Sequence, residues 1–225
     1  MKGWQRFVLL TAAAVIIIAG GLFAWQRYSD WRAERLAEEA ALKDAKKTVA
    51  EQTAGTEYFL KSTYSDSDMT YAQLFDRVDD RTKKITDAIV SVQSSELGDE
   101  QKQAAVDYLN ALSATLDAME MEYRKGLNSS NSVDSMKSAE SDYVTTPYNE
   151  YSDPWERKRL LDARDEAQKA LNEFKDAVRS YNAALKTLRK TTSADQAKLN
   201  GFYLVNGTVL SKAITHSDEE VKSTT

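Results

Sequence analysis

The side chains that could do chemistry in this sequence of 225 residues are few and scattered. The single histidine, His216, stands beside Asp218 and Glu219, a combination that could supply metal ligands but that lies in a polar, acidic tail. Asp79 and Asp80 are adjacent carboxylates without a His, Cys or second acidic group placed to set up acid–base chemistry. No hydroxyl residue has a paired base, and the chain has no glycine-rich phosphate loop. We therefore expect a non-enzymatic protein with no catalytic residue, no metal site and no cofactor.

A cluster of aromatic residues is the best candidate for a partner-binding site. Its members lie around a stretch rich in Ser, Asn and Tyr, and they are Tyr143, Tyr148, Tyr151 and Trp155. Aromatic side chains are enriched in binding hot spots, and connecting segments carry function more often than core helices do. The same side chains could instead close the end of a helical bundle, and the sequence leaves both interpretations open.

Three consecutive cations, Arg157, Lys158 and Arg159, extend this candidate site. They lie in the first turn of a predicted helix, where the helix dipole disfavours positive charge. A locally unfavourable choice can mark a contact with an acidic partner or with anionic lipid headgroups. The alternative is that neighbouring acidic residues pair with them, namely Glu150, Asp153, Glu156 and Asp162.

Residues 7–25 form a run of 19 residues without a charge, which predicts a transmembrane helix. Trp4 and Trp25 stand 21 residues apart, or about 31 Å along a helix axis, so their indole rings would lie near the two membrane interfaces. Tyr28 and Trp31 would extend the outer aromatic belt by one turn. We expect residues 1–25 to be a short cytoplasmic segment and an uncleaved membrane anchor.

A cleaved signal peptide is the alternative, because Lys2 and Arg6 supply a basic start and the residues at 19–21 are small. Against cleavage, the apolar run continues past residue 21 and enters a charged helix without a break. Lys and Arg flank the run on both sides and do not settle its orientation. We expect the N-terminus in the cytoplasm and the rest of the chain outside it, in the periplasm or extracellular space, with the span in the cell (inner) membrane.

Residues 26–55 are rich in Ala, Glu and Lys, and their apolar stripe is narrow. We expect a helical spacer that continues the transmembrane helix into solvent, although the same residues could be the first helix of a bundle. Residues 56–215 are then predicted to form an antiparallel bundle of three to four long helices, which makes the fold all-α.

Three long amphipathic helices are predicted within this bundle, at residues 68–95, 99–127 and 154–190. Apolar residues recur in each at spacings of three, four or seven, as helices packed at a shallow angle require. The seams are Tyr71, Leu74, Val78, Ile85, Ile89 and Val92 in the first helix, Ala105, Leu109, Leu112, Leu116, Met119 and Tyr123 in the second, and Ala167, Leu171, Phe174, Val178, Tyr181, Leu185 and Leu188 in the third.

The segments between and after these helices are predicted to be less regular. Gly126 would end the second helix, and residues 128–152 would form a long connection with a short helix at most. A short helix is expected after residue 193, packed on the bundle through Leu199 and Phe202. Residues 216–225 are polar and acidic, which predicts a disordered tail.

The charge of the chain restricts its partners. Beyond Trp25 there are 28 Lys and Arg against 35 Asp and Glu, a formal charge of −7, which argues against nucleic-acid binding. We expect a structural or accessory subunit that contacts the lipid bilayer and presents its bundle to one or more membrane or envelope proteins, with self-association into a homo-oligomer left open. The alternative is an extracytoplasmic ligand-sensing bundle that signals through a partner membrane protein.

Overall fold

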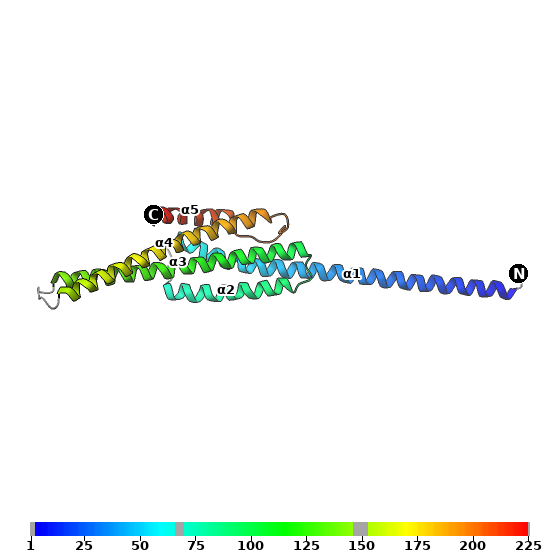
Figure 1. Cartoon of the computed structure of the whole chain (residues 1–225). Coiled ribbons are helices and arrows are strands. Elements are labelled where there is room, and N and C mark those ends of the chain that lie inside the picture. The colour runs from blue at the N-terminus through cyan, green and yellow to red at the C-terminus, as the bar shows by residue number, and fades with distance from the viewer. Residues whose placement is uncertain (1–2, 66–69, 146–152, 225) are drawn as a thin grey trace.

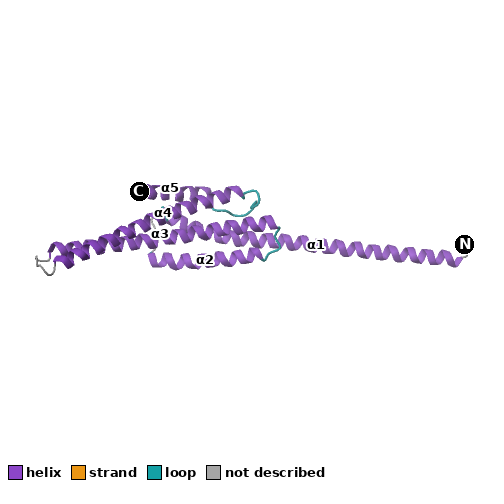
Figure 2. Ribbon diagram, viewed as in Figure 1, coloured by secondary structure: helices purple, strands orange, loops and turns teal. Residues whose placement is uncertain are grey.

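The computed structural model describes residues 3–65, 70–145 and 153–224, with side chains from Trp25 onward. This part of the chain contains five helices and no strand (Figure 2). The helices are α1 (Gly3–Ser62), α2 (Tyr71–Gln93), α3 (Asp99–Thr145), α4 (Asp153–Ala194) and α5 (Gly207–Thr224). The predicted all-α class and helical bundle are therefore confirmed.

The helices form an elongated molecule with a bundle at its centre (Figure 1). The C-terminal part of α1, all of α2 and α5, and parts of α3 and α4 lie side by side there, with successive helices antiparallel. The first half of α1 projects from one end of the bundle. The end of α3 and the beginning of α4 project together from the opposite end as an antiparallel pair, which we call the α3–α4 hairpin.

The core is built from the predicted seams. All the seam residues of α3 from Ala105 to Met119 are fully buried, as are Val78 and Ile85 of α2 and Val178, Leu185 and Leu188 of α4. Tyr71 departs from the prediction and is half exposed, because it occupies the first position of α2 at the edge of the bundle. Thr70 caps this helix, since its hydroxyl accepts from the backbone of Gln73.

The predicted end of the second helix at Gly126 is wrong, because α3 continues to Thr145. Small residues cover the face of α3 beyond this point, and Ser129 and Ala139 are buried. A Cβ atom at residue 126 would lie 3.2 Å from the Phe174 ring of α4, so Gly126 allows close approach of the two helices. Lys125 also bonds Glu173 of α4 at 2.7 Å. Tertiary packing against α4 thus extends a helix that composition alone ends early.

The spacer at residues 26–55 and the bundle overlap in α1. Residues 25–40 are exposed throughout, whereas Ala45 and Val49 are buried in the core. The helix passes Gly55 without a break, and the Arg81 side chain of α2 occupies the space where a Cβ of residue 55 would lie. The free-standing part of the helix is therefore shorter than predicted, because small and β-branched residues from Ala45 onward already pack against α3.

The predicted disordered tail at residues 216–225 is also wrong in the described part, since residues 216–224 belong to α5. The first half of this helix packs on the bundle through four buried side chains, Val209, Leu210, Ala213 and Ile214. In the second half, Ser217 is fully buried and Asp218 accepts from Asn182 at 2.9 Å and from Lys186 at 2.8 Å, both on α4. Polar residues that suggest disorder by composition are thus satisfied by specific partners.

The segment between α4 and α5 contains turns, where a short helix was predicted. Leu199, Phe202 and Val205 are nevertheless buried, as expected for a segment packed on the bundle. Its backbone is tied to the core by two side chains. Tyr108 of α3 accepts from the Val205 amide at 2.9 Å, and Glu57 of α1 accepts from the Asn206 amide at 2.6 Å.

Candidate functional site

The end of the α3–α4 hairpin carries most of the predicted partner-binding residues. Tyr143 is exposed near the end of α3, and Trp155 is 60% exposed near the start of α4. The structure brings these two helix ends to the same extremity of the molecule (Figure 1). Tyr148 and Tyr151 lie outside the described residues. The predicted cluster is thus on a helical hairpin, and the two described members do not close the end of the bundle core.

The three cations of this region have different surroundings. Arg159 bonds Asp142 of α3 and lies 3.6 Å from Glu156, and its guanidinium group is 5.7 Å from the centre of the Trp155 ring. Arg157 and Lys158 are exposed. Arg159 therefore fixes the hairpin, in agreement with the predicted pairing to Glu156, whereas the other two side chains face solvent.

Apolar residues that the sequence pattern did not single out add to this end of the molecule. Val144 is 75% exposed and Leu161 is 48% exposed. Together with Tyr143 and Trp155 they form what we call the hairpin tip. Large exposed apolar side chains that gather at one extremity are typical of an interaction surface.

The predicted membrane-interface residues lie on the free-standing part of α1. Trp25, Tyr28 and Trp31 are all exposed, and the rings of Tyr28 and Trp31 are 6.0 Å apart. Arg35 stacks over Trp31 at 4.9 Å. The side chains of Trp4 and of residues 7–24 lie outside the described part. Within the part that is described, no helix combines the length and the apolar character that crossing a membrane requires.

The acidic residues noted from sequence are engaged in ordinary surface contacts. Asp80 accepts from Lys84 at 2.6 Å, and this bond lowers the pKa of its carboxyl. The bond from Lys186 and then that from Asn182 likewise lower the pKa of Asp218. His216 lies on α5 with its Nε2 4.0 Å from Glu220. Among the described residues, no group of three or more His, Cys, Asp or Glu could hold a metal ion.

A cavity of about 180 Å³ lies where the hairpin leaves the bundle, and sequence reasoning missed it. Four helices and the turn that directly follows α1 contribute to its wall, and we call it the five-helix cavity. The lining residues are Thr63 just after α1, Tyr71 of α2, Glu122, Tyr123 and Gly126 of α3, Phe174 and Tyr181 of α4, and His216 and Glu220 of α5. Of these nine residues, four are Tyr or Phe and two are glutamates.

Glu122 is the unusual residue of this cavity. Glu122 is only 6% exposed, and its Oε2 atom has no hydrogen-bond partner. Burial, together with repulsion from the Glu220 carboxylate and a shared proton with it, raises the pKa of Glu122 to about 9. Near neutral pH the carboxyl of Glu122 therefore carries its proton.

Tyr181 supplies a second unsatisfied polar atom in the same cavity. The residue is 2% exposed, and its hydroxyl makes no hydrogen bond of good geometry. Thr63 faces it but donates its own hydroxyl to the Leu60 carbonyl at 2.8 Å. Burial, followed by the nearby Glu122, raises the pKa of the Tyr181 phenol well above its usual value. Two buried polar atoms without partners in one cavity call for a ligand or ordered water.

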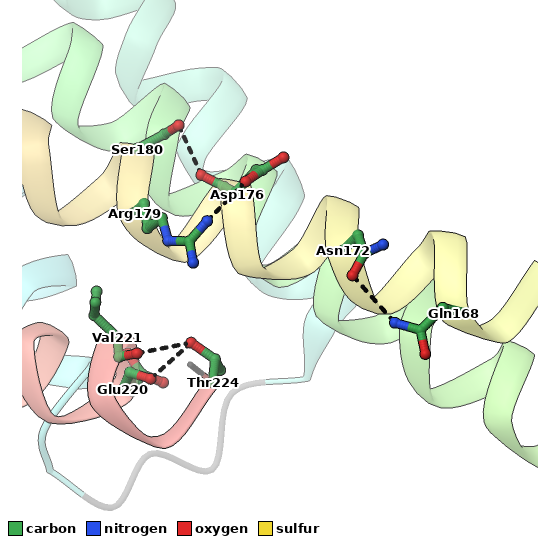
Figure 3. A network of polar contacts seen from close by, with 8 residues as sticks. All are labelled: Gln168, Asn172, Asp176, Arg179, Ser180, Glu220, Val221 and Thr224. Atoms are coloured by element: carbon green, nitrogen blue, oxygen red, sulfur yellow. Dashed lines mark hydrogen bonds and ion pairs between the residues drawn. The ribbon is translucent and has the colours of Figure 1, made fainter.

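The last turns of α5 are held in a defined position beside α4. Figure 3 shows the Thr224 hydroxyl bonded to the carbonyl groups of Glu220, at 2.9 Å, and Val221, at 3.2 Å. Along α4, Ser180 and Arg179 bond to Asp176 (Figure 3). These bonds are local to each helix, and the bonds of Asp218 to Asn182 and Lys186 join α5 to α4. The partly exposed carboxyl of Glu220 lies on the same helix, at the wall of the cavity.

Comparisons with known proteins provide no relative: no protein-family model, no curated protein and no solved structure matches this chain. The two candidate sites, the hairpin tip and the five-helix cavity, are therefore the basis on which a function can be argued.

Proposed function

We propose that this chain is a non-enzymatic membrane-anchored adaptor that presents the hairpin tip to a membrane or envelope protein. In this proposal residues 7–25 cross the cell membrane with the N-terminus in the cytoplasm, and the bundle lies in the periplasm or outside the cell. The observation that carries the proposal is the position of the tip. Its exposed aromatic and apolar residues lie at the extremity opposite the N-terminal helix (Figure 1).

The shape of the hairpin supports a presenting role. Two long helices leave the bundle and continue as a pair held together by small residues such as Ser129, Ala139 and Ala170. A narrow pair of this kind adds little core, so its length is better explained by reach than by stability. Trp155 and Tyr143 at its end are side chains of the type that dominates binding hot spots.

The chemistry of the tip indicates the kind of partner. The apolar residues Val144 and Leu161 would fill a shallow apolar depression. Arg157 and Lys158 are exposed next to Trp155 and would meet acidic groups at the rim of that depression. Opposite charges at an interface steer the encounter and select partners more than they add affinity.

The anchor is supported by the sequence and by the exposed aromatic residues that follow it. An uncharged run of 19 residues is long enough to cross a bilayer. The exposed rings of Trp25, Tyr28 and Trp31 suit the headgroup region, where amphipathic aromatic side chains are favoured. Residues 25–40 would then span about 24 Å as a free helix between membrane and bundle.

A pull-down from mild detergent with a C-terminal tag on the full chain tests the adaptor role. We expect a membrane or envelope protein to be recovered in stoichiometric amount. The double variant Tyr143→Ala, Trp155→Ala should reduce this recovery at least tenfold, because loss of two hot-spot aromatics commonly costs more than about 1.4 kcal/mol. Tyr58→Ala is the matched control, since Tyr58 is equally exposed but lies on the bundle. Recovery of the chain alone, or equal recovery with the double variant, would contradict the proposal.

Ligand sensing is the second candidate function, and the five-helix cavity is the observation that favours it. A sensor of this kind would transmit binding to a partner membrane protein. A ligand that binds the folded state raises the midpoint of thermal unfolding. A screen of small molecules against the purified chain would therefore find stabilising compounds if the cavity senses a ligand.

A further inference from the structure

We propose that the five-helix cavity binds a small organic ammonium ion, held by the carboxylates of Glu122 and Glu220 against the rings of Tyr123, Phe174 and Tyr181. This inference does not depend on the adaptor role, because it rests on residues of the cavity and not on the hairpin tip. It identifies a ligand class for a site that lies between α2, α3, α4 and α5, beside the turn that follows α1.

The charge of the cavity is the first argument. Two carboxyl groups face each other there, and one of them is nine-tenths buried. None of the described residues that line the cavity is a lysine or an arginine. A buried carboxylate without a cationic partner is costly, and in the unliganded protein a proton on Glu122 relieves that cost. An ammonium ion can take the place of this proton and supply the missing positive charge.

The aromatic walls are the second argument. The rings of Tyr71 and Tyr123 lie 6.2 Å apart at a tilt of 59°, and Phe174 and Tyr181 complete the wall from α4. Aromatic faces attract alkylammonium groups through the negative electrostatic potential of the ring face. A metal ion would gain less from such walls, and among the described residues no cluster of three metal-ligating side chains is present. The site is therefore suited to an organic cation.

The unpartnered polar atoms are the third argument. Oε2 of Glu122 is an acceptor without a donor, and the hydroxyl of Tyr181 is also unsatisfied. An ammonium group with N–H bonds can donate to both. The volume of about 180 Å³ limits the ligand, because a cavity of about 150 Å³ in another protein accommodates benzene. We therefore expect a primary amine with about six to eight non-hydrogen atoms.

Binding should be linked to the release of a proton. The titratable groups that face Glu122 are Glu220 and His216 from α5, Tyr181 from α4, Tyr123 from its own helix and Tyr71 from α2. The turn after α1 contributes only Thr63, which does not titrate. Below pH 9 the ammonium ion displaces the proton of Glu122, so its affinity rises with pH. Burial raises the pKa of the Tyr123 and Tyr181 phenols, so both stay neutral across this range.

Titration calorimetry on the full chain in mild detergent tests the inference, with benzylamine as the probe and benzyl alcohol as its neutral isostere. At pH 7.5 benzylamine should bind at least tenfold more tightly than benzyl alcohol. Two buffers of different ionisation enthalpy, neither a primary amine, should report the release of about one proton. Glu122→Gln should weaken benzylamine binding at least tenfold, whereas Glu166→Gln, an exposed acid of α4, should leave it unchanged.

Several outcomes would overturn the inference. Equal affinity for benzylamine and benzyl alcohol would show that the cavity binds apolar groups without regard to charge. If benzylamine, putrescine and methylammonium all fail to bind, the cavity is not a site for small amines. Tight binding of potassium or calcium ions with no amine binding would assign a metal site. Circular dichroism of Glu122→Gln distinguishes lost binding from lost folding, since the neutral amide should leave the fold intact. None of these results bears on the pull-down with the hairpin tip.

Discussion

At the scale of single residues, Glu122 is where folding and function oppose each other. A glutamate buried among aromatic rings lowers the stability of the folded protein whenever it is ionised. A lysine or an arginine beside Glu122 would neutralise its charge, but none of the described residues that line the cavity is a lysine or an arginine. A costly group retained without a partner is typical of a site shaped for a ligand.

The stability of the protein should therefore depend on pH through Glu122. The pKa of this carboxyl is about 9 in the folded state against 4.5 when it is unperturbed, so the unfolded chain loses the proton first. The contribution of Glu122 to the free energy of unfolding is fully present below pH 4.5. It declines as the pH rises toward 9, by up to about 1.4 kcal/mol per pH unit. Glu122→Gln removes the titration, so its stability should not decline in this way.

Urea unfolding at pH 5, 6.5 and 8 measures this effect. We expect Glu122→Gln to be more stable than the parent protein by up to about 5 kcal/mol at pH 8, and by about 1 kcal/mol or less at pH 5. Glu166→Gln should follow the parent protein at every pH, because Glu166 is exposed. A parallel pH dependence of the parent protein and Glu122→Gln would show that the buried carboxyl is not the cause.

At the scale of helices, the sequence predicts seams well and helix ends poorly. The spacing of apolar residues identifies one face of each helix, and the core residues from Leu109 to Met119 follow it. Helix ends depend on what packs beside them, and α3 continues beside α4 for 19 residues beyond Gly126, where its end was expected. Likewise, the sequence predicts that Asp218 is solvated, whereas the structure places Lys186 of α4 within hydrogen-bonding distance of it.

The missed cavity follows from the missed fifth helix. Glu122 stands next to the seam residue Tyr123, on a side of α3 that a three-helix bundle would leave in water. The helix α5 covers that side and brings Glu220 to it. A sequence pattern reports the faces of one helix, whereas burial of Glu122 needs the position of another helix. The sequence left open whether Tyr143 and Trp155 are exposed or close the bundle, and the structure leaves both exposed.

Removal of residues 216–225 tests whether α5 is a structural element. We expect the free energy of unfolding to fall by about 2–4 kcal/mol, because the deletion exposes Tyr181 and the core beneath Ser217 and removes the contacts of Asp218. Lys222→Ala, an exposed change in the same segment, should alter it by less than about 0.5 kcal/mol. Urea unfolding gives both values. A deletion without effect would mean that the helix does not pack on the bundle in solution.

At the scale of the whole molecule, the two extremities can be altered without touching the core. Residues 25–40 of α1 are exposed along their whole length, so they contribute little to the bundle. If they set the height of the hairpin tip above a membrane, their length matters for the partner and not for folding. The cavity lies between these extremities, where the hairpin meets the bundle, and a ligand there would contact the base of the hairpin.

Insertion of seven helix-forming residues after Glu34 tests this height. The insertion lengthens the free helix by about 10 Å and turns it by nearly two full turns, so the bundle keeps almost the same orientation. We expect unchanged thermal unfolding but at least a fivefold loss of the recovered partner, because the tip no longer meets a partner fixed in the same membrane. Replacement of seven residues at the same place by the inserted sequence, with no change in length, should leave recovery intact. Equal recovery from both variants would mean that the partner is not held at a fixed distance from the membrane.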